Sequence, residues 1–358
     1  MTPKSLQVEV VVLLLILMLV TACARGPSTQ PSAQPAPAQA ANTNQSGDQG
    51  AGVADHEAGD QAEVLPQLSA VKLESGQKLR VVATTNIVAD VVANIGGDLI
   101  ELTPLMPVGA DPHSFTPTPQ DLRTLNDAYA IFMNGLGLEE SLLPILENLD
   151  TPVPLVSVNA GIEPLAMAED EHKGEEQSDH HQEGADPHTW FSVPNVAVWV
   201  DNIAGALSAL DPEHAEDFAA AAAGYKQRLH ELDSDIRTQV QSIPKDQRKL
   251  VTDHEAFGYL AHEYGLELVG SVLPSLSTLA AASAKELAAL QENMKVESVR
   301  ALFVSSTVNP QTATQVAGDL GIPVVTLYVG SLSDAQGPAP SYIDLMEYDV
   351  AQIVAVLR

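Results

Sequence analysis

Residues 213–243 read EHAEDFAAAAAGYKQRLHELDSDIRTQVQSI and end directly before Pro244. Five consecutive alanines at 219–223 favour a helix, because alanine has the highest helix propensity. Asp233 and Arg237 are four residues apart and can form an ion pair on one face of that helix. At 1.5 Å per residue the segment would be about 45 Å long, enough to cross a whole domain. The sequence therefore predicts a rigid helix that connects two halves of the protein.

On both sides of this helix, short apolar strands alternate with amphipathic helices. Before it, LRVVAT is followed by TNIVADVVANIGG, and after it KLVTDH is followed by EAFGYLAHEYG. This alternation predicts βα units and parallel sheets. The fold class is therefore predicted to be α/β, with two parallel-sheet lobes at 78–212 and 244–358 joined by the helix 213–243. A ligand is expected in the interlobe cleft, beyond the carboxyl ends of the strands.

The N-terminus has the pattern of an exported protein. Residues 10–20 are 11 consecutive apolar residues, too short to span a membrane, which takes about 20 residues, but typical of a signal-peptide core. Val20-Thr21-Ala22-Cys23 follows and resembles a bacterial lipobox. We therefore predict a signal peptide at 1–22 and a lipid on Cys23. The alternative is an ordinary secretory signal with a chance cysteine.

Composition restricts both location and partners. Residues 23–77 are rich in Pro, Ala, Gln, Ser and Gly and are predicted to form a disordered tether between lipid and folded body. The formal net charge of −30 excludes a general nucleic-acid binder and disfavours adsorption to anionic lipid. The lipid anchor must therefore hold the protein on the extracytoplasmic side of the membrane. A single cysteine excludes an intramolecular disulfide and a cysteine-rich metal site.

Three histidines are predicted to lie where strands lead into helices. They are His113 in GADPHSF, His188 in GADPHTW and His254 in LVTDHEAF. Proline restricts the backbone beside the first two, and neutral imidazole is a common zinc ligand. Asp111 and Asp186 could bond the second ring nitrogens. Any one histidine alone could be a surface or capping residue, but the three together predict a metal site.

The segments ADPHSFTPTPQDL, DPHTWFSVPN and TDHEAFGYLAHEYGL resemble the signature blocks of the zinc/manganese solute-binding proteins of bacterial ABC transporters, the cluster A-I family, and of its zinc-uptake branch in particular. The resemblance extends from about residue 79 to the C-terminus. It implies two lobes, a backbone helix and a metal buried at the lobe interface. It also implies His113, His188 and His254 as ligands, and an ABC permease and ATPase as partners of a monomeric protein.

The sequence departs from this family at the fourth ligand. Many members carry an acid in the loop after the last core strand, where this chain has Gly330, and a glutamate where it has Ser305. The fourth position stays open between water and a nearby carboxylate such as Glu255 or Asp334. Three imidazoles and water favour Zn²⁺ over the harder Mn²⁺.

Residues 169–186, EDEHKGEEQSDHHQEGAD, contain eight carboxylates and three histidines. The resemblance places the family's acidic histidine-rich loop here. Imidazoles and carboxylates in such a tract would form weak metal sites near the cleft. The alternative is a solvated insertion with no role in binding.

The leading hypothesis is a lipid-anchored receptor that captures Zn²⁺ and passes it to a permease, without catalysis. A metal-dependent hydrolase is the alternative, with Glu255 as its base, although Gly258 stands where the zincin pattern needs a second histidine. A surface adhesin is a third possibility, but the sequence has no adhesive repeat that favours it.

Overall fold

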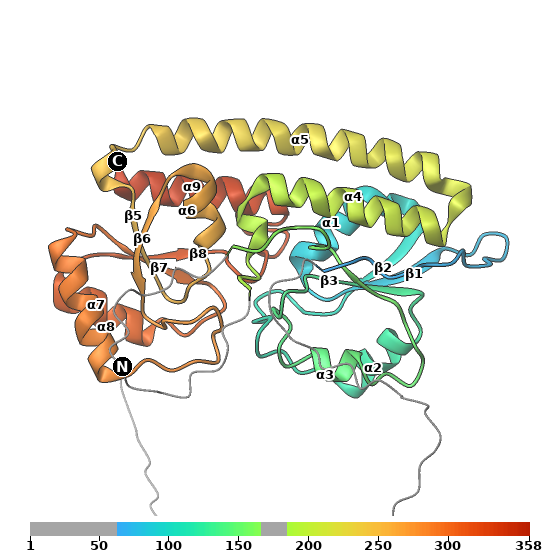
Figure 1. Cartoon of the computed structure of the whole chain (residues 1–358), viewed down its shortest axis with the longest axis horizontal. Helices are drawn as coiled ribbons and strands as arrows, with labels where there is room; N and C mark the ends of the chain where they lie inside the picture. The colour runs from blue at the N-terminus through green and yellow to red at the C-terminus, as the bar shows by residue number, and fades with distance from the viewer. Residues whose placement is uncertain (1–62, 166–184) are drawn as a thin grey trace, which may run out of the picture. The chain divides into compact units, whose positions relative to one another are not determined.

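The computed structural model describes residues 63–165 and 185–358. In these residues the chain forms two four-stranded parallel sheets, ordered β2-β1-β3-β4 and β6-β5-β7-β8. Each sheet and its helices make one lobe, and the long helix α5 runs along both lobes (Figure 1). The predicted α/β class with two parallel-sheet lobes is therefore confirmed.

In its described residues, the first lobe contains four short strands and four α-helices. They are β1 (Leu79–Ala83), α1 (Asn86–Gly96), β2 (Ile100–Pro104), α2 (Pro119–Asn126), β3 (Ala130–Met133), α3 (Leu143–Leu146), β4 (Leu155–Ser157) and α4 (Val193–Leu210). Thr85 caps α1 by accepting a hydrogen bond from Val88 N, and Thr118 forms a capping box with Asp121 at the start of α2. Both caps fix the residue at which the helix begins.

Helix α3 is shorter than the helix that LEESLLPILENL predicts. Glu139 in this stretch is fully buried, and its carboxylate accepts hydrogen bonds from Asn134 N at 2.7 Å, Gly135 N at 3.1 Å and Thr84 Oγ1 at 2.7 Å. Because the glutamate satisfies the turn after β3, residues 138–142 form turns and the helix begins only at Leu143.

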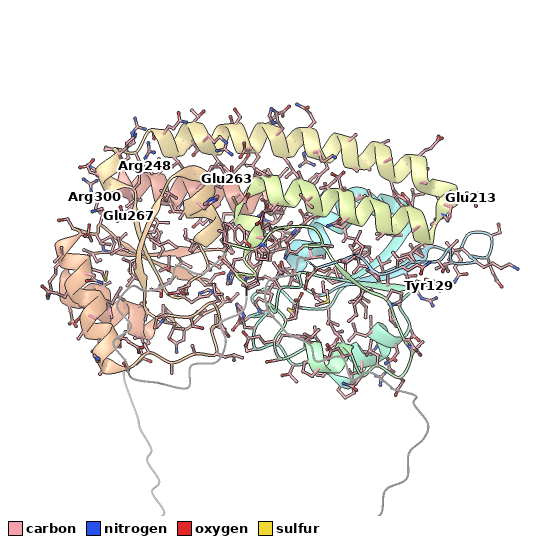
Figure 2. The ribbon with its side chains drawn as sticks, viewed as in Figure 1. Tyr129, Glu213, Arg248, Glu263, Glu267 and Arg300 are labelled. Atoms are coloured by element: carbon pink, nitrogen blue, oxygen red, sulfur yellow. The ribbon has the colours of Figure 1, made fainter. Side chains whose placement is uncertain are left out.

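Helix α5 (Ala215–Gln241) is the predicted connecting helix, two residues shorter at each end than 213–243. It packs on α1 and α4 of the first lobe and on α6 and α9 of the second. The predicted pair is present, with Arg237 Nε 2.9 Å from Asp233 Oδ2. Arg248 donates to the carbonyls of Ile243 and Gln241 at the C-terminal end of α5 (Figure 2), which satisfies acceptors that a helix end leaves free.

The second lobe repeats the same order of elements. They are β5 (Lys249–Thr252), α6 (Gly258–Tyr264), β6 (Glu267–Ser271), α7 (Ala284–Val296), β7 (Leu302–Ser305), α8 (Gln311–Leu320), β8 (Val324–Leu327) and α9 (Tyr342–Leu357). The apolar segment IPVVTLYVGSL predicts a strand that continues past Leu327, but β8 ends there. The backbone N–H of Tyr328 donates to Asp349 of α9 and not to a neighbouring strand. Residues 328–333 are thereby free to form a loop toward the first lobe.

One apolar core is continuous across both lobes beneath α5. It includes Val81 of β1 and Phe303 of β7, together with buried residues of α1, α4, α5 and α9. Phe191 and Phe257 meet with ring centroids 4.6 Å apart, which joins the segment after His188 to the segment after His254. Shared packing of this kind opposes large hinge motions.

Part of the predicted tether is packed on the fold. The sequence predicts a tether at 23–77, but within it Leu65, Leu68 and Val71 pack on the core. Val71 N also donates to Leu210 O at 2.8 Å. The low-complexity composition ends before these leucines and valine, so the prediction extended the tether too far. The predicted signal peptide 1–22 and Cys23 lie outside the described residues.

Among the described residues, α4 is the one helix whose length and apolar composition would suit a membrane span. Half of it is buried, and Val196, Trp199 and Ile203 belong to the shared core. It packs along α5, so its apolar character is explained by burial within the fold.

Candidate metal site

His113 lies in the loop between β2 and α2, and its side chain is 2% exposed. Its backbone N–H donates to Asp111 Oδ1 at 3.2 Å, and its carbonyl accepts from the hydroxyl of Ser141 at 2.9 Å. Its Nδ1 is 3.7 Å from Glu140 Oε1. The loop is thus held from both sides, with the imidazole directed inward. The expected bond from Asp111 to the ring is absent, because that carboxylate binds the backbone instead.

His188 lies directly before the short 3-10 helix Thr189–Phe191 and is 1% exposed. Asp186 Oδ1 accepts from the His188 backbone N–H and lies 2.9 Å from His188 Nδ1, as the sequence predicted for this carboxylate. Asn134, at the end of β3, donates to Pro187 O at 2.9 Å. These contacts fix the ring and leave Nε2, which has no hydrogen-bond partner, to face the other histidines.

His254 follows β5 and is 2% exposed. Its Nδ1 lies 2.8 Å from Asp253 Oδ1, and the other oxygen of that carboxylate accepts from Ser305 N at 2.7 Å. Asp253 was not among the predicted partners of the imidazoles. Its position directly before His254 was the available signal, but only the fold shows that the carboxylate reaches the imidazole and β7 together.

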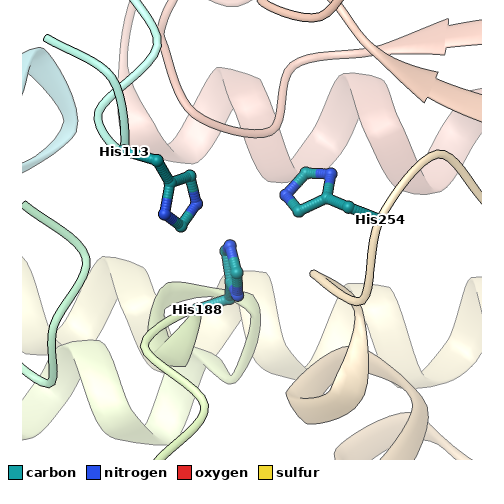
Figure 3. A group of neighbouring side chains, drawn as sticks. All are labelled: His113, His188 and His254. Atoms are coloured by element: carbon teal, nitrogen blue, oxygen red, sulfur yellow. The ribbon is translucent and has the colours of Figure 1, made fainter. Parts of the chain in front are cut away.

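The three imidazoles converge at one point (Figure 3). Ring centroids are 5.5 Å apart for His113 and His188, 5.9 Å for His113 and His254, and 5.3 Å for His188 and His254. One nitrogen of each ring lies within 4.8 Å of the other two. Three nitrogens on one tetrahedral zinc, at about 2.0–2.1 Å from it, are about 3.4 Å apart. The rings are therefore close to the arrangement that one ion requires, and small inward shifts complete it.

A cavity of about 10 Å³ lies between the rings. Besides the three histidines, its walls are formed by Asp111, Pro112, Trp190, Thr278, Thr307, Val329 and Gly330. Space of this size holds about one water-sized group. It suits an ion and excludes an organic solute.

Burial shifts the pKa of two titratable groups at the site in opposite directions. Burial raises the pKa of Asp186 to about 7, with the backbone N–H of His188 acting in the opposite direction. Burial, and then repulsion by His254 and His113, lowers the pKa of His188 well below its ordinary value. Metals bind neutral imidazole, so His188 is in the binding form at neutral pH without losing a proton.

Neither proposed acidic fourth ligand lines the cavity. Asp334 is exposed and accepts from Gln336 N at 2.9 Å, and the side chain of Glu255 accepts from Ser271 Oγ at 3.5 Å. Gly330 does line the cavity, whereas Ser305 lies behind Thr307, with the two hydroxyls 2.8 Å apart. Among the described residues, Asp111 is the one carboxylate in the cavity wall, and both of its oxygens already accept hydrogen bonds.

Hydrogen bonds between the lobes close the site. Ser331, in the loop after β8, accepts from Asn86 Nδ2 and from Gly109 N, both at 2.8 Å. Thr278 of the second lobe donates to Asp111 Oδ2 at 2.6 Å. The loop that carries His113 is therefore fastened to the second lobe on both sides of the cavity.

Known proteins resemble this chain in sequence and in fold over most of its length. A family model described as zinc-uptake complex component A, periplasmic, matches residues 81–356. The manganese-binding lipoprotein MntA of Halalkalibacterium halodurans is 33% identical over 285 residues, 79% of this chain and 90% of that protein. The iron-binding protein YfeA of Yersinia pestis is 32% identical over 281 residues, 78% of this chain and 86% of that protein.

Solved structures of similar proteins have the same fold. The periplasmic zinc-binding protein TroA of Treponema pallidum superimposes with a TM-score of 0.70 at 28% identity, covering 78% of this chain and 99% of that one. The names of these relatives mention manganese, iron or zinc, so the family extends over several metals. With two parallel-sheet lobes and a match over residues 81–356, the chain belongs to the zinc-uptake component A family within cluster A-I, the extracytoplasmic substrate-binding proteins of metal ABC importers, which are not enzymes.

Proposed function

We propose that this protein captures Zn²⁺ in preference to Mn²⁺ and delivers it to the permease and ATPase of an ABC importer. The proposed protein ligands are His113, His188 and His254. One observation carries the proposal: three buried imidazoles from distant parts of the chain each bring one nitrogen within 4.8 Å of the others around a cavity of ionic size.

The preference for zinc is argued from the ligand atoms. Imidazole nitrogen suits Zn²⁺, whereas Mn²⁺ favours carboxylate and water oxygen. The carboxylates of Asp186 and Asp253 bond the outer Nδ1 atoms of their histidines and so are not free for an ion. Both raise the basicity of the imidazoles they contact, which strengthens the bond to zinc. Relatives of similar identity are named for other metals, so the ligand set and not the family supports this choice.

A hydrolase is disfavoured by the same geometry. A metal-bound water needs a positioned base and space for a substrate. The cavity of about 10 Å³ has no room for a substrate, and Glu255 is not part of its described wall. Family membership also indicates transport without catalysis. An adhesive role has no structural feature in its favour among the described residues.

For membrane attachment we propose a lipid on Cys23, after removal of residues 1–22, and a monomeric protein. The relative MntA is itself named a lipoprotein. Because Leu65, Leu68 and Val71 pack on the core, the tether between the lipid and the lobes is proposed to lie before these residues in the chain. Labelling of cells with a radioactive or alkyne-bearing fatty acid tests this, since Cys23→Ser abolishes the label if the proposal holds.

The binding experiment uses metal-free full-length protein. Competition with a coloured chelator measures the affinity for Zn²⁺ and Mn²⁺, and calorimetry gives the stoichiometry. We expect one tight Zn²⁺ ion, a weaker Mn²⁺ interaction and no hydrolysis of ester or phosphate test substrates. Equal or tighter binding of Mn²⁺ contradicts the preference, and turnover that scales with bound metal contradicts the transport role.

A further inference from the structure

His113 differs from the other two proposed ligands in what supports its ring. Asp186 Oδ1 lies 2.9 Å from His188 Nδ1. Asp253 Oδ1 lies 2.8 Å from His254 Nδ1. Both carboxylates are almost fully buried, so the fold itself holds those two rings. The ring of His113 is equally buried, yet among the described residues neither of its nitrogens has a hydrogen-bond partner. Since buried polar atoms without partners are unfavourable, this ring has the most to gain from a new contact.

Glu140 lies on the outer side of the His113 ring. Its Oε1 is 3.7 Å from His113 Nδ1, which is too long for a hydrogen bond. His113 lines the cavity, whereas Glu140 is not part of the described cavity wall. Nδ1 therefore faces away from the cavity, and Nε2 is left for an ion. A carboxylate on Nδ1 is the arrangement already present at the other two proposed ligands.

The backbone around Glu140 is fixed, while its side chain is able to move. Glu139 is buried, and its carboxylate accepts from backbone N–H groups of the turn after β3. Ser141 donates to the carbonyl of His113 through its hydroxyl, at 2.9 Å, and through its backbone N–H, at 3.3 Å. Between these anchors the Glu140 side chain is 40% exposed. A movement of about 1 Å, which needs no repacking, would bring its oxygen into hydrogen-bond distance of Nδ1.

Glu140 also lies close to the second lobe. The pKa of Glu140 is below its ordinary value because His113, and to a smaller extent Ser277 of the second lobe, stabilise the carboxylate against its partial burial. The neighbouring Thr278 donates to Asp111 Oδ2, in the loop that carries His113, at 2.6 Å. The glutamate is therefore placed where the loop of His113 meets the second lobe.

We propose that Glu140 is the positioning residue for His113: when Nε2 binds the ion, the Glu140 carboxylate moves onto Nδ1–H and holds the ring in place. This inference rests on the proposed metal binding at the three histidines. A bond between ionised carboxylate and imidazole N–H strengthens the ligand on its opposite nitrogen. Two ligands are then preset by buried aspartates, and the third is secured as the ion binds. Release of the ion begins at His113, because its supporting carboxylate can withdraw into solvent.

Three substitutions of Glu140 separate positioning from simple attraction of a cation. Glu140→Gln keeps an acceptor oxygen at the same reach without the charge, Glu140→Asp keeps the charge on a side chain one methylene shorter, and Glu140→Ala removes both. We expect chelator competition to show a loss of Zn²⁺ affinity of about tenfold or more for Glu140→Ala and Glu140→Asp, and a smaller loss for Glu140→Gln. Glu147→Ala and Glu147→Gln, at an exposed position directly after α3, are the matched controls.

Two further measurements report on the bond itself. Stopped-flow mixing with a chelator should show that the loss lies mainly in faster release, since the carboxylate engages only once the ion is bound. Proton NMR of the zinc-loaded wild type should show three downfield imidazole N–H signals, one for each proposed ligand. We expect Glu140→Ala to remove or shift one of these signals and to leave the other two in place.

Several outcomes overturn the inference. Glu140→Ala that binds and releases Zn²⁺ like the Glu147 controls shows that the carboxylate does not hold the ring. Glu140→Asp that binds like the wild type, with Glu140→Gln as weak as Glu140→Ala, shows attraction by charge alone. A changed coordination number in the visible absorption of bound Co²⁺ would make Glu140 a ligand and not a positioning residue.

Metal-free protein separates positioning from a purely structural role. Without metal we expect Glu140→Ala to melt at the temperature of the wild type, because the bond to Nδ1 is not formed there. A clearly lower melting temperature would indicate that Glu140 stabilises the fold instead. A wild type that binds no Zn²⁺ tightly refutes the proposed function and this inference with it. Tight binding that no Glu140 variant alters refutes the inference alone.

Discussion

Asp253 Oδ1 lies 2.8 Å from Nδ1 of His254, the next residue in the chain, and its Oδ2 accepts from Ser305 N at 2.7 Å. One carboxylate therefore orients a proposed ligand and anchors it to β7. In Asp253→Asn the amide can serve only one of these donors, because an NH₂ group must face the other. We expect Zn²⁺ affinity to fall by about 10- to 100-fold, as when other such supporting carboxylates are lost.

Chelator competition measures this loss, with Asp235→Asn at an exposed position of α5 as the control. Circular dichroism checks that both variants are folded. Unchanged affinity in a folded Asp253→Asn protein would show that the orientation of His254 does not depend on this carboxylate.

The second prediction concerns the ligands themselves. His113→Ala, His188→Ala and His254→Ala each leave two imidazoles, which cannot hold a tetrahedral ion tightly. We expect each variant to lose high-affinity Zn²⁺ binding in chelator competition, while His230→Ala, at an exposed position of α5, retains it. A histidine whose removal leaves affinity unchanged is not a ligand.

The third prediction concerns the acidic histidine-rich loop 169–186, most of which lies outside the described residues. Leu165, before the loop, and Asp186, its last residue, are both held by Tyr259, whose hydroxyl accepts from Leu165 N and donates to Asp186 O, both at 3.1 Å. Deletion of 170–185 keeps Asp186. We expect calorimetry to show an intact tight site and fewer weak ones. Loss of the tight site would contradict the role assigned to the loop.

The fourth prediction concerns closure of the lobes. Ser331 is buried, and its hydroxyl accepts from Gly109 N, so Ser331→Ala leaves that N–H without a partner. The cost of about 1–3 kcal/mol for such a group disfavours the closed form. We expect stopped-flow mixing with a chelator to show release of metal about tenfold faster or more. Ser234→Ala, exposed on α5, is the control. Equal release rates would show that Ser331 does not restrain opening.

The helix and the core that the two lobes share also limit how far the lobes can move relative to each other. Because α5 and one core are shared by both lobes, we expect metal binding to slow hydrogen exchange mainly in the loops around the three histidines. Exchange changes along the whole of α5 would instead indicate a hinge.

The fifth prediction follows from Asp349, which is fully buried in α9 and has one oxygen without a partner. Burial raises the pKa of this carboxyl well above its ordinary value, against the opposing hydrogen bond from Tyr328 N. The folded state thus holds the proton more tightly than the unfolded state. The protonated Asp349 carboxyl therefore stabilises the fold fully at pH values below its pKa in the unfolded state. This stabilisation is lost, by up to about 1.4 kcal/mol per pH unit, as pH rises to the pKa of the carboxyl in the folded state.

Asp349→Asn removes this titration and keeps an oxygen for Tyr328 N. We expect urea unfolding to show that the variant gains stability relative to the wild type as pH rises from about 5 to 8. The difference in unfolding free energy between Asp235→Asn and the wild type should stay nearly constant over this pH range. A difference for Asp349→Asn that does not change with pH would mean that the carboxyl does not titrate in this range.

Much of the fold was predictable because it depends on local patterns. The alternation of apolar strands and amphipathic helices is sufficient to indicate two α/β lobes, and the alanine run before Pro244 is sufficient to indicate α5. Predictions were inaccurate where hydrogen bonds from side chains to the backbone compete with local propensity. Glu139 shortens α3 by bonding the turn after β3, and Asp349 ends β8 by taking the N–H of Tyr328. The apolar residues at 65, 68 and 71 find their partners only after the lobe has formed.

The sequence by itself determined that His113, His188 and His254 stand at strand-to-helix turns, since residue type and neighbouring turn signals are local properties. Only the tertiary structure decided that these rings meet around one small cavity, and that Asp253 and not Asp111 holds an imidazole. The reason is physical: separations of a few ångströms between residues far apart in the chain are fixed by the packing of whole lobes, and no local pattern of residues encodes them.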